Sequence, residues 1–175
     1  IAPALAAGCT VVLRPASLTP LTAVALGHLI QQAGVPAGVV NIVPSSRSVE
    51  VSTTWLEDSR VRAVSFTGST QVGRVLMKQA AEKVLVSSME LGGNAPFVVA
   101  ADADIDAAVT GAVQAKLRGG GEACTAANRF YVHRDVAQEF TEKFSAVVRD
   151  LRVGPALADE ANQIGPLVTP AARDK

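Results

Sequence analysis

The sequence predicts an α/β protein built on a parallel sheet that is covered by helices on both faces. In the first half of the chain, short apolar runs alternate with segments of helical periodicity, and only short loops separate them. Apolar residues occupy 49% of the 175 positions, which is enough to bury such a sheet. The apolar runs predict strands at residues 9–13, 39–43, 61–67, 84–88, 97–100 and 129–133.

Helices are expected between these strands, and capping residues predict where some of them begin and end. Thr19 can cap a helix whose first residue is Pro20, and Gly34 ends that helix. Asp135 is expected to cap a later helix that carries phenylalanines on one face. The remaining helices are expected at residues 48–56, 70–81 and 102–117, the last opened by acidic residues that favour a helix N-terminus.

Gly92-Gly93 is expected to mark a domain boundary, because the alternating pattern restarts after it. We predict one domain over residues 1–92 and the beginning of a second over 93–175. The chain has no initial methionine, and a further helix is expected to begin near residue 171. We therefore expect the chain to be the middle part of a longer protein.

Charge and composition exclude several classes of partner. Basic residues and acidic residues each number 16, so the formal net charge is zero, which argues against a nucleic-acid or polybasic membrane surface. No apolar run approaches the ~18 residues of a spanning helix, and no His/Cys cluster has metal-ligand spacing. The two cysteines, Cys9 and Cys124, lie far apart and favour free thiols in a reducing compartment. We expect a cytoplasmic protein without a metal, nucleic-acid or membrane partner.

Four loops follow the predicted strands of the first domain, and they are expected to form a cofactor site. Ligands of parallel α/β sheets bind beyond the carboxyl ends of the strands. One loop, Gly68-Ser-Thr-Gln-Val-Gly73, stands between a strand and a helix, where backbone amides can face a phosphate. An ordinary glycine turn is the competing interpretation. The four loops cover residues 14–19, 44–48, 68–73 and 90–93.

Cys124 is the candidate nucleophile, and Glu90, 34 positions earlier and beside a Gly-Gly hinge, is the candidate base. A short loop that enters a helix at Glu122 would bring backbone donors to the sulfur, favour its thiolate and hold a developing oxyanion. The competing interpretations are a buried apolar cysteine and a capping or solvated carboxylate. Cys9 begins an apolar strand and is expected to pack in the core.

Four segments of the chain resemble the aldehyde dehydrogenase family in their order and spacing. Together they cover essentially the whole chain, and four ordered matches are far more specific than any one alone. The run Leu-Gly-Gly-Asn-Ala-Pro-Phe and the Ala-Asn-Arg that follows Cys124 are most similar to the succinate-semialdehyde dehydrogenase branch. The four segments are residues 8–20, 65–73, 89–96 and 121–129.

The resemblance implies part of a Rossmann-type NAD(P)-binding domain over residues 1–92, followed by the start of an α/β catalytic domain. It implies that the Cys124 thiolate attacks an aldehyde, that hydride passes to the nicotinamide, and that Glu90 activates water to hydrolyse the resulting thioester. The expected substrate is succinic semialdehyde. The alternatives are another aldehyde, or an inactive nucleotide-binding or structural fragment. The segment alone is expected to be inactive, and its parent to be a homodimer or homotetramer.

The resemblance also assigns individual binding residues. Arg118, six positions before Cys124, matches the arginine that binds the distal carboxylate of succinic semialdehyde. Arg14 and Ser17 replace the lysine and glutamate that usually grip the adenosine ribose, so NADP is expected to be tolerated or preferred over NAD. The expected cofactor contacts are Arg14, Ser17, Arg47, Phe66, Thr67, Gly68, Ser69, Val72, Leu91 and Gly92.

Overall fold

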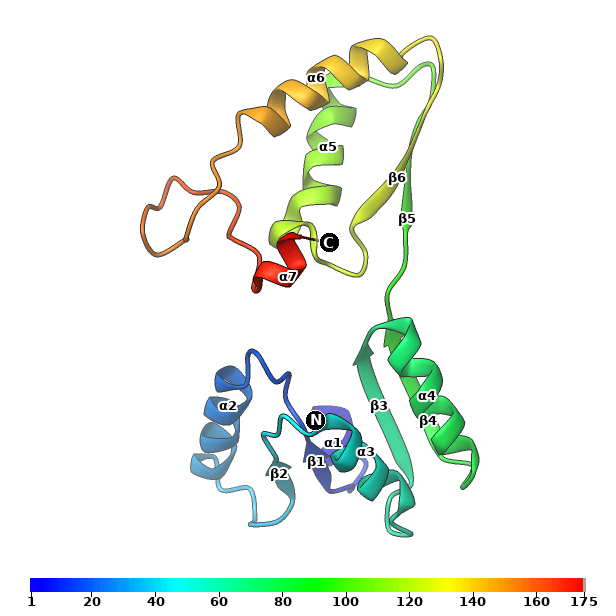
Figure 1. Cartoon of the computed structure of the whole chain (residues 1–175), viewed down its shortest axis with the longest axis vertical. Helices are drawn as coiled ribbons and strands as arrows, with labels where there is room; N and C mark the ends of the chain where they lie inside the picture. Colours follow the sequence, from blue (N-terminus) through cyan, green and yellow to red (C-terminus); the bar gives the residue numbers. More distant parts are fainter. Residues whose placement is uncertain (175) are drawn as a thin grey trace. The chain divides into compact units, whose positions relative to one another are not determined.

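The computed structural model describes residues 1–174 and confirms the predicted α/β class, with helices and strands alternating along the chain (Figure 1). Each predicted strand is present, although several begin or end at other residues. The elements are α1 Ala2–Ala6, β1 Val11–Leu13, α2 Leu21–Gln32, β2 Val40–Ile42, α3 Ser48–Glu57, β3 Ala63–Gly68, α4 Thr70–Ala81, β4 Val86–Leu91, β5 Ala95–Val99, α5 Ile105–Leu117, the 3₁₀ helix η1 Arg118–Gly121, β6 Ala127–Val132, α6 Ala137–Arg149 and α7 Pro170–Arg173.

The described residues divide into two compact units. The first unit comprises residues 1–66 and 71–89, and the second comprises residues 67–70 and, among the described residues, 90–174. The strands pair two by two, as β1 with β2, β3 with β4, and β5 with β6. The domain boundary expected at Gly92-Gly93 stays a prediction.

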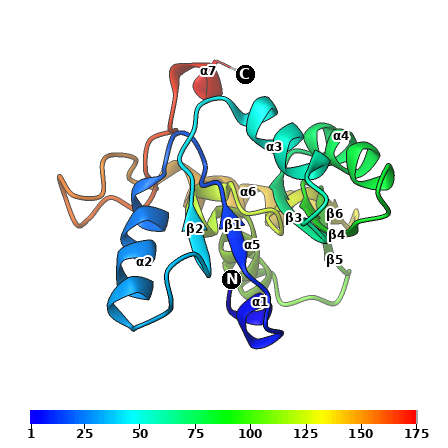
Figure 2. The same ribbon diagram turned by 90° about the horizontal axis from the view of Figure 1, so that it is seen from below.

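The first unit is held together by short strand pairs and a small buried core. β1 and β2 are parallel, with Val11 opposite Val40, and α2, which connects them in the chain, lies beside β2 (Figure 2). Gly27 permits this close approach, because a Cβ at that position would lie 2.9 Å from Ile42 Cγ1. None of the residues of α2 is buried, and Leu21 is 79% exposed. The buried hydrophobic residues of this unit are Leu56, Leu76 and Ala80.

The second unit has a continuous core beneath one face of the parallel β5–β6 pair. α5 and α6 pack against each other, and α5 also contacts β6. The ring of Phe130 lies 5.6 Å from that of Phe97 and 5.4 Å from that of Phe144, distances typical of favourable aromatic pairs. Val98 points away from this core and is 72% exposed. The buried members of the core are Val99, Ile105, Val109, Ala112 and Phe140.

Two predicted helix caps are wrong, because each helix begins one residue later than expected. Thr19 does not cap α2; its amide donates to Ala16 O in a turn, and Pro20 occupies the N-cap position with helical backbone angles. A side-chain cap needs an extended N-cap residue, which Pro20 is not. Asp135 does not cap α6, whose N-cap is Val136 without a side-chain hydrogen bond.

Strand β4 occupies residues 86–91, not the predicted 84–88, and this shift moves Glu90 from a loop into a strand. Val84 has a φ of +52°, a left-handed conformation that no strand residue adopts. It ends the turn that follows α4, where Leu85 N donates to Ala80 O. Among residues 1–174, none of the helices is long and apolar enough to cross a membrane.

Candidate functional site

Three consecutive glycines carry the chain from α5 toward Cys124. Gly119, Gly120 and Gly121 have φ values of +62°, +74° and +81°, all in the left-handed region. Only glycine adopts such angles without steric cost, so this run of three permits a sharp change of direction that other residues would resist. The local sequence therefore dictates the loop that presents Cys124.

Cys124 is exposed in a turn in which Ala126 N donates to Ala123 O at 2.9 Å. The prediction that a helix follows Glu122 is wrong, since the chain continues from this turn into strand β6. The Gly-Gly-Gly run is followed by a single turn, too short for a helix, before Ala127 pairs with β5. Within this chain, Cys124 is nevertheless exposed and not packed among apolar side chains. Cys9 is also exposed, so its expected place in the core is wrong.

The pairing of β5 with β6 brings the Glu90 and Cys124 segments to the same end of one strand pair. Ala95 lies opposite Ala127 and the strands are parallel, so both segments precede the pair at its amino end. Two side chains from β6 reinforce this junction. Asn128 Nδ2 lies 3.5 Å from Gly93 O, and Arg129 Nε donates to Asn94 O at 2.9 Å. Strand β5, helix α5 and the 3₁₀ helix η1 lie between Glu90 and Cys124 in the chain, and the pairing of β5 with β6 returns the chain to the end of β5 that follows Glu90.

Arg118 lines a hollow of about 310 Å³ beside the candidate nucleophile. Its Nη2 lies 3.4 Å from Thr125 Oγ1, and Thr125 directly follows Cys124. Ala123, which directly precedes Cys124, also lines the hollow, so both neighbours of the thiol border it. The remaining lining residues belong to α5 and are Gly111, Gln114 and Ala115. An exposed guanidinium that lines this hollow can bind an anionic group.

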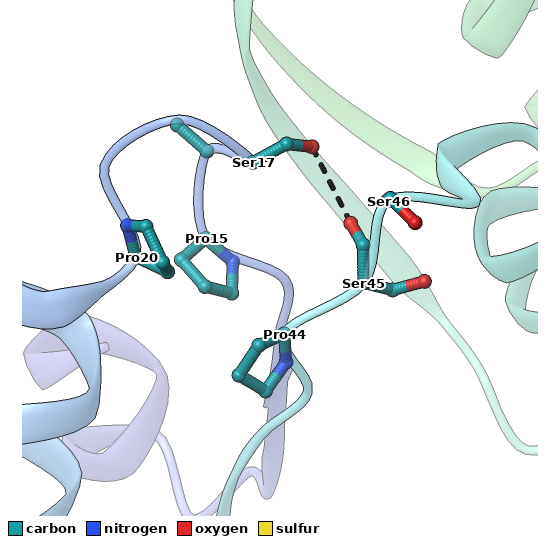
Figure 3. A pocket seen from close by; sticks show the side chains of 7 residues that line it. Pro15, Ser17, Pro20, Pro44, Ser45 and Ser46 are labelled. Atoms are coloured by element: carbon teal, nitrogen blue, oxygen red, sulfur yellow. Dashed lines mark hydrogen bonds between the residues drawn. The ribbon is translucent and has the colours of Figure 1, made fainter.

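The loops after β1 and β2 form a second hollow, of about 280 Å³, in the first unit. Figure 3 shows the two loops facing each other, with the Ser17 hydroxyl directed at Ser45 O, to which it donates at 3.3 Å. Arg14 also donates to Ser45 O, through Nε at 3.2 Å and Nη2 at 3.0 Å. The same Nη2 donates to Ser17 Oγ at 2.6 Å. The hollow is lined by Pro15, Ala16, Ser17, Pro20, Pro44, Ser45 and Ser46.

Arg47, also in the loop after β2, forms an ion pair with Glu50 at 3.0 Å in which the arginine side chain is 74% exposed. Such a pair contributes little to stability, so the guanidinium can exchange Glu50 for a stronger anion at small cost. This loop was predicted from the sequence as part of the cofactor site, but Ser45 was not singled out. Its carbonyl is the acceptor that joins the two loops. No side-chain pattern signals a backbone acceptor.

The other expected cofactor contacts lie along β3, α4 and β4. Phe66, Thr67 and Gly68 end β3, Ser69 separates it from α4, and Val72 lies in the first turn of that helix. The turn therefore stands between a strand and a helix, as the sequence predicts. Leu91 is the last residue of β4, and Gly92 follows it. Their contact with a cofactor stays a prediction.

Two polar residues near Cys124 were not singled out from the sequence. Lys116, on the last turn of α5, donates to Asn128 Oδ1 at 2.7 Å. Asn128 belongs to the Ala-Asn-Arg run that carries part of the family resemblance. Its contact with Lys116 could not be predicted from that run, because it depends on the fold. Among residues 1–174, no group of three or more His, Cys, Asp or Glu side chains could hold a metal.

These features define a class of α/β protein that presents an exposed cysteine on a glycine-rich loop at the end of a parallel strand pair. The chain belongs to the aldehyde dehydrogenase family, whose model matches residues 1–175. It is 58% identical over 174 residues to the succinate-semialdehyde dehydrogenase of Paenarthrobacter nicotinovorans, covering 99% of this chain and 38% of the relative.

Two further proteins are similar over nearly the whole chain. A probable NADP-dependent succinate-semialdehyde dehydrogenase of Sinorhizobium fredii is 52% identical over 175 residues, which are 100% of this chain and 35% of that protein. The crystal structure of succinate-semialdehyde dehydrogenase from Burkholderia pseudomallei superposes with a TM-score of 0.94 at 46% identity, covering 98% of this chain and 35% of its own. The chain thus spans little more than a third of these relatives, and the expected family and fold are confirmed.

Proposed function

We propose that the full-length protein containing this chain oxidises an aldehyde to its carboxylic acid with NADP or NAD, and that succinic semialdehyde is its substrate. Membership of the aldehyde dehydrogenase family supports the reaction, and the names of the most similar relatives support the substrate. The single observation that carries the proposal is the exposed Cys124 on its glycine loop, next to a hollow lined by Arg118.

Cys124 and Glu90 divide the covalent chemistry between them. The Cys124 sulfur, as thiolate, bonds to the aldehyde carbon, and the carbonyl oxygen becomes the oxyanion of a thiohemiacetal. When bound, the nicotinamide cofactor supplies the acceptor for the hydride that leaves this carbon, and a thioester remains on Cys124. Glu90 then takes a proton from water, the hydroxide adds to the thioester carbonyl, and the sulfur leaves as thiolate with release of the acid. The Gly92-Gly93 pair after Glu90 gives the backbone the freedom that such a base requires.

The donor set of the first hollow fits the adenosine end of a dinucleotide. Ser17 offers a hydroxyl where a carboxylate would repel a 2′-phosphate, and Arg14 adds positive charge that is already held in place by Ser45 O. Preorganised donors bind with less loss of side-chain freedom than mobile ones. These residues support NADP as a cofactor and leave NAD acceptable.

Arg118 is proposed to bind the distal carboxylate of the substrate. A planar guanidinium binds a carboxylate through two parallel hydrogen bonds, which fixes the distance from the anionic end to the aldehyde carbon. Arg118 lies six positions before Cys124, at the other end of the glycine run, and shares a hollow with the residues on both sides of that thiol. Another aldehyde with an anionic end would bind the same arginine, so the length of the carbon chain between its two ends distinguishes the candidate substrates.

Assembly of the full-length protein as a homodimer or homotetramer stays a prediction.

The test measures NADPH and NADH formation by the full-length protein with succinic semialdehyde and with a neutral aldehyde of equal chain length. Wild type is expected to favour succinic semialdehyde, and Arg118→Ala to raise the KM for it by about a hundredfold while the neutral aldehyde is unaffected. Arg118→Lys, which keeps the charge without the fork, is the matched control and should fall between the two. Equal rates with both aldehydes, unchanged by Arg118→Ala, would rule out the substrate but leave the family chemistry intact.

A further inference from the structure

Lys116 joins the helix before the Cys124 loop to the strand after it. Its ammonium donates to Asn128 Oδ1 at 2.7 Å, across 12 positions of sequence that contain the whole glycine run and Cys124. The side chain is half-buried and stands in the last turn of α5, where positive charge is stabilised by the helix carbonyls. The loop is therefore closed at its base by one charge-assisted hydrogen bond.

Asn128 extends this link to the segment that carries Glu90. While its side-chain oxygen accepts from Lys116, its Nδ2 lies 3.5 Å from Gly93 O, three residues after Glu90. One amide side chain thus contacts both the helix before the nucleophile and the backbone after the base. The planarity of the amide fixes the direction of each contact relative to the other.

Gly121 shows how closely the loop is packed on Lys116. A Cβ at Gly121 would lie 3.2 Å from Lys116 O and 3.8 Å from both Cε and Nζ of the same side chain. The glycine run therefore rests against the backbone and the side chain of the residue that closes the loop. A displacement of the Lys116 side chain would remove both the packing contact with Gly121 and the hydrogen bond to Asn128.

We propose that Lys116, acting through Asn128, is a positioning residue that holds the Cys124 loop in register with the Glu90 segment. The inference rests on the proposed function for its catalytic consequence. Neither side chain is required to touch the substrate. Their effect is to keep the thiol and the carboxylate in the relative placement that both covalent steps need, and small misplacements of reacting groups slow such steps strongly.

The test compares Lys116→Met, Asn128→Ala and the double variant in the full-length protein. Each is expected to lower kcat about tenfold and to leave the KM for aldehyde and cofactor within about twofold. The double variant is expected to lose no more than either single one, since both remove the same link. Lys116→Arg, which retains a charged donor, should restore most of the rate. Lys143→Met is the matched control, because Lys143 pairs with Asp106 and Glu139 elsewhere in the second unit.

Hydrogen exchange of the peptide covering residues 119–128 gives a readout that does not depend on turnover. Exchange is expected to be about tenfold faster in Lys116→Met and unchanged in Lys143→Met. Unchanged exchange in Lys116→Met, or an equal loss of kcat in Lys143→Met, overturns the proposal, as does a fully additive double variant. If the wild type oxidises no aldehyde, the proposed function fails, and the exchange comparison still decides whether Lys116 and Asn128 hold the loop.

Discussion

The two units of the chain differ in how much of their apolar surface they bury. In the second unit, strands β5 and β6 and helices α5 and α6 enclose a continuous core in which four phenylalanine rings touch. In the first unit, the buried hydrophobic residues are two leucines and one alanine, and none of the residues of α2 is buried. Within this chain, the second unit therefore buries a larger apolar core of its own than the first unit does.

The candidate catalytic residues and the candidate cofactor-binding residues named below lie in different units. Glu90, Arg118 and Cys124 all belong to the second unit, so the candidate covalent machinery stands on the better-packed scaffold. Arg14, Ser17 and Arg47 belong to the first, where they are fixed by hydrogen bonds between loops. Reacting groups require more accurate placement than groups that only bind, and the core of the second unit provides it. Substitutions in the two units are expected to have different consequences.

The largest expected effect comes from replacing each of the two cysteines by alanine. One cysteine lies in each unit, and both are exposed. Cys124→Ala is expected to lower kcat at least about a thousandfold, because the nucleophile is lost. Cys9→Ala is expected to leave kcat unchanged, since its sulfur lies 4.0 Å from Ala7 O and has no assigned part in the proposed chemistry. Steady-state assays of aldehyde oxidation measure both. Retained turnover in Cys124→Ala would contradict the assignment of the nucleophile to the second unit.

The next effect tests the difference in packing. Phe140 is 3% exposed and stacks on Phe144, so Phe140→Ala is expected to cost about 3–5 kcal/mol of unfolding free energy. Leu21→Ala, on the exposed face of α2, is expected to cost less than about 0.5 kcal/mol. Urea unfolding of the full-length protein, followed by tryptophan fluorescence and circular dichroism, gives both values. Similar costs at the two positions would mean that α2 is covered in the full-length protein.

A smaller effect tests the role assigned to the loops of the first unit. Arg14→Ala is expected to raise the KM for NADP about tenfold and the KM for NAD much less, because a 2′-phosphate contact is lost. Arg60→Ala is a suitable control, since Arg60 is an exposed arginine paired with Asp58. An equal rise for NADP and NAD would show that Arg14 serves only to hold Ser45 O and the loop.

The smallest effect concerns helix α5 of the second unit, which has a side-chain N-cap. Asp104 accepts a hydrogen bond from Ala107 N at 3.0 Å, and Asp104→Ala is expected to cost about 1 kcal/mol. The corresponding Thr19→Ala in the first unit is expected to have almost no effect, because Thr19 caps nothing. Thermal unfolding compares the two variants. A matched loss at both positions would contradict the cap assignments.

Much of the fold was predictable because strong local signals agree with one another. The alternation of apolar runs and helical segments predicts the α/β class, and glycine at 119, 120 and 121 predicts a loop that only glycine can form. The exposed Cys124 follows from that loop. The family resemblance, carried by four ordered segments, is confirmed by the match over residues 1–175.

The features that the sequence did not predict depend on long-range contacts or on single backbone angles. The left-handed Val84 moves β4 and places Glu90 in a strand, and no propensity predicts a valine in that conformation. Thr19 fails as a cap because its amide is used in a turn. Cys9 is exposed because the short strand begins two residues after it. The link from Lys116 to Asn128 joins residues whose closeness depends on the pairing of β5 and β6.

The central claim, that Cys124 forms a thioester which Glu90 hydrolyses, has a direct test in Glu90→Gln. The full-length variant is mixed with succinic semialdehyde and NADP, quenched in acid, and its peptides are weighed by mass spectrometry. We expect the Cys124 peptide to carry one succinyl group, accompanied by a single burst of NADPH and little further turnover. An unmodified Cys124 peptide together with undiminished steady turnover would contradict the account.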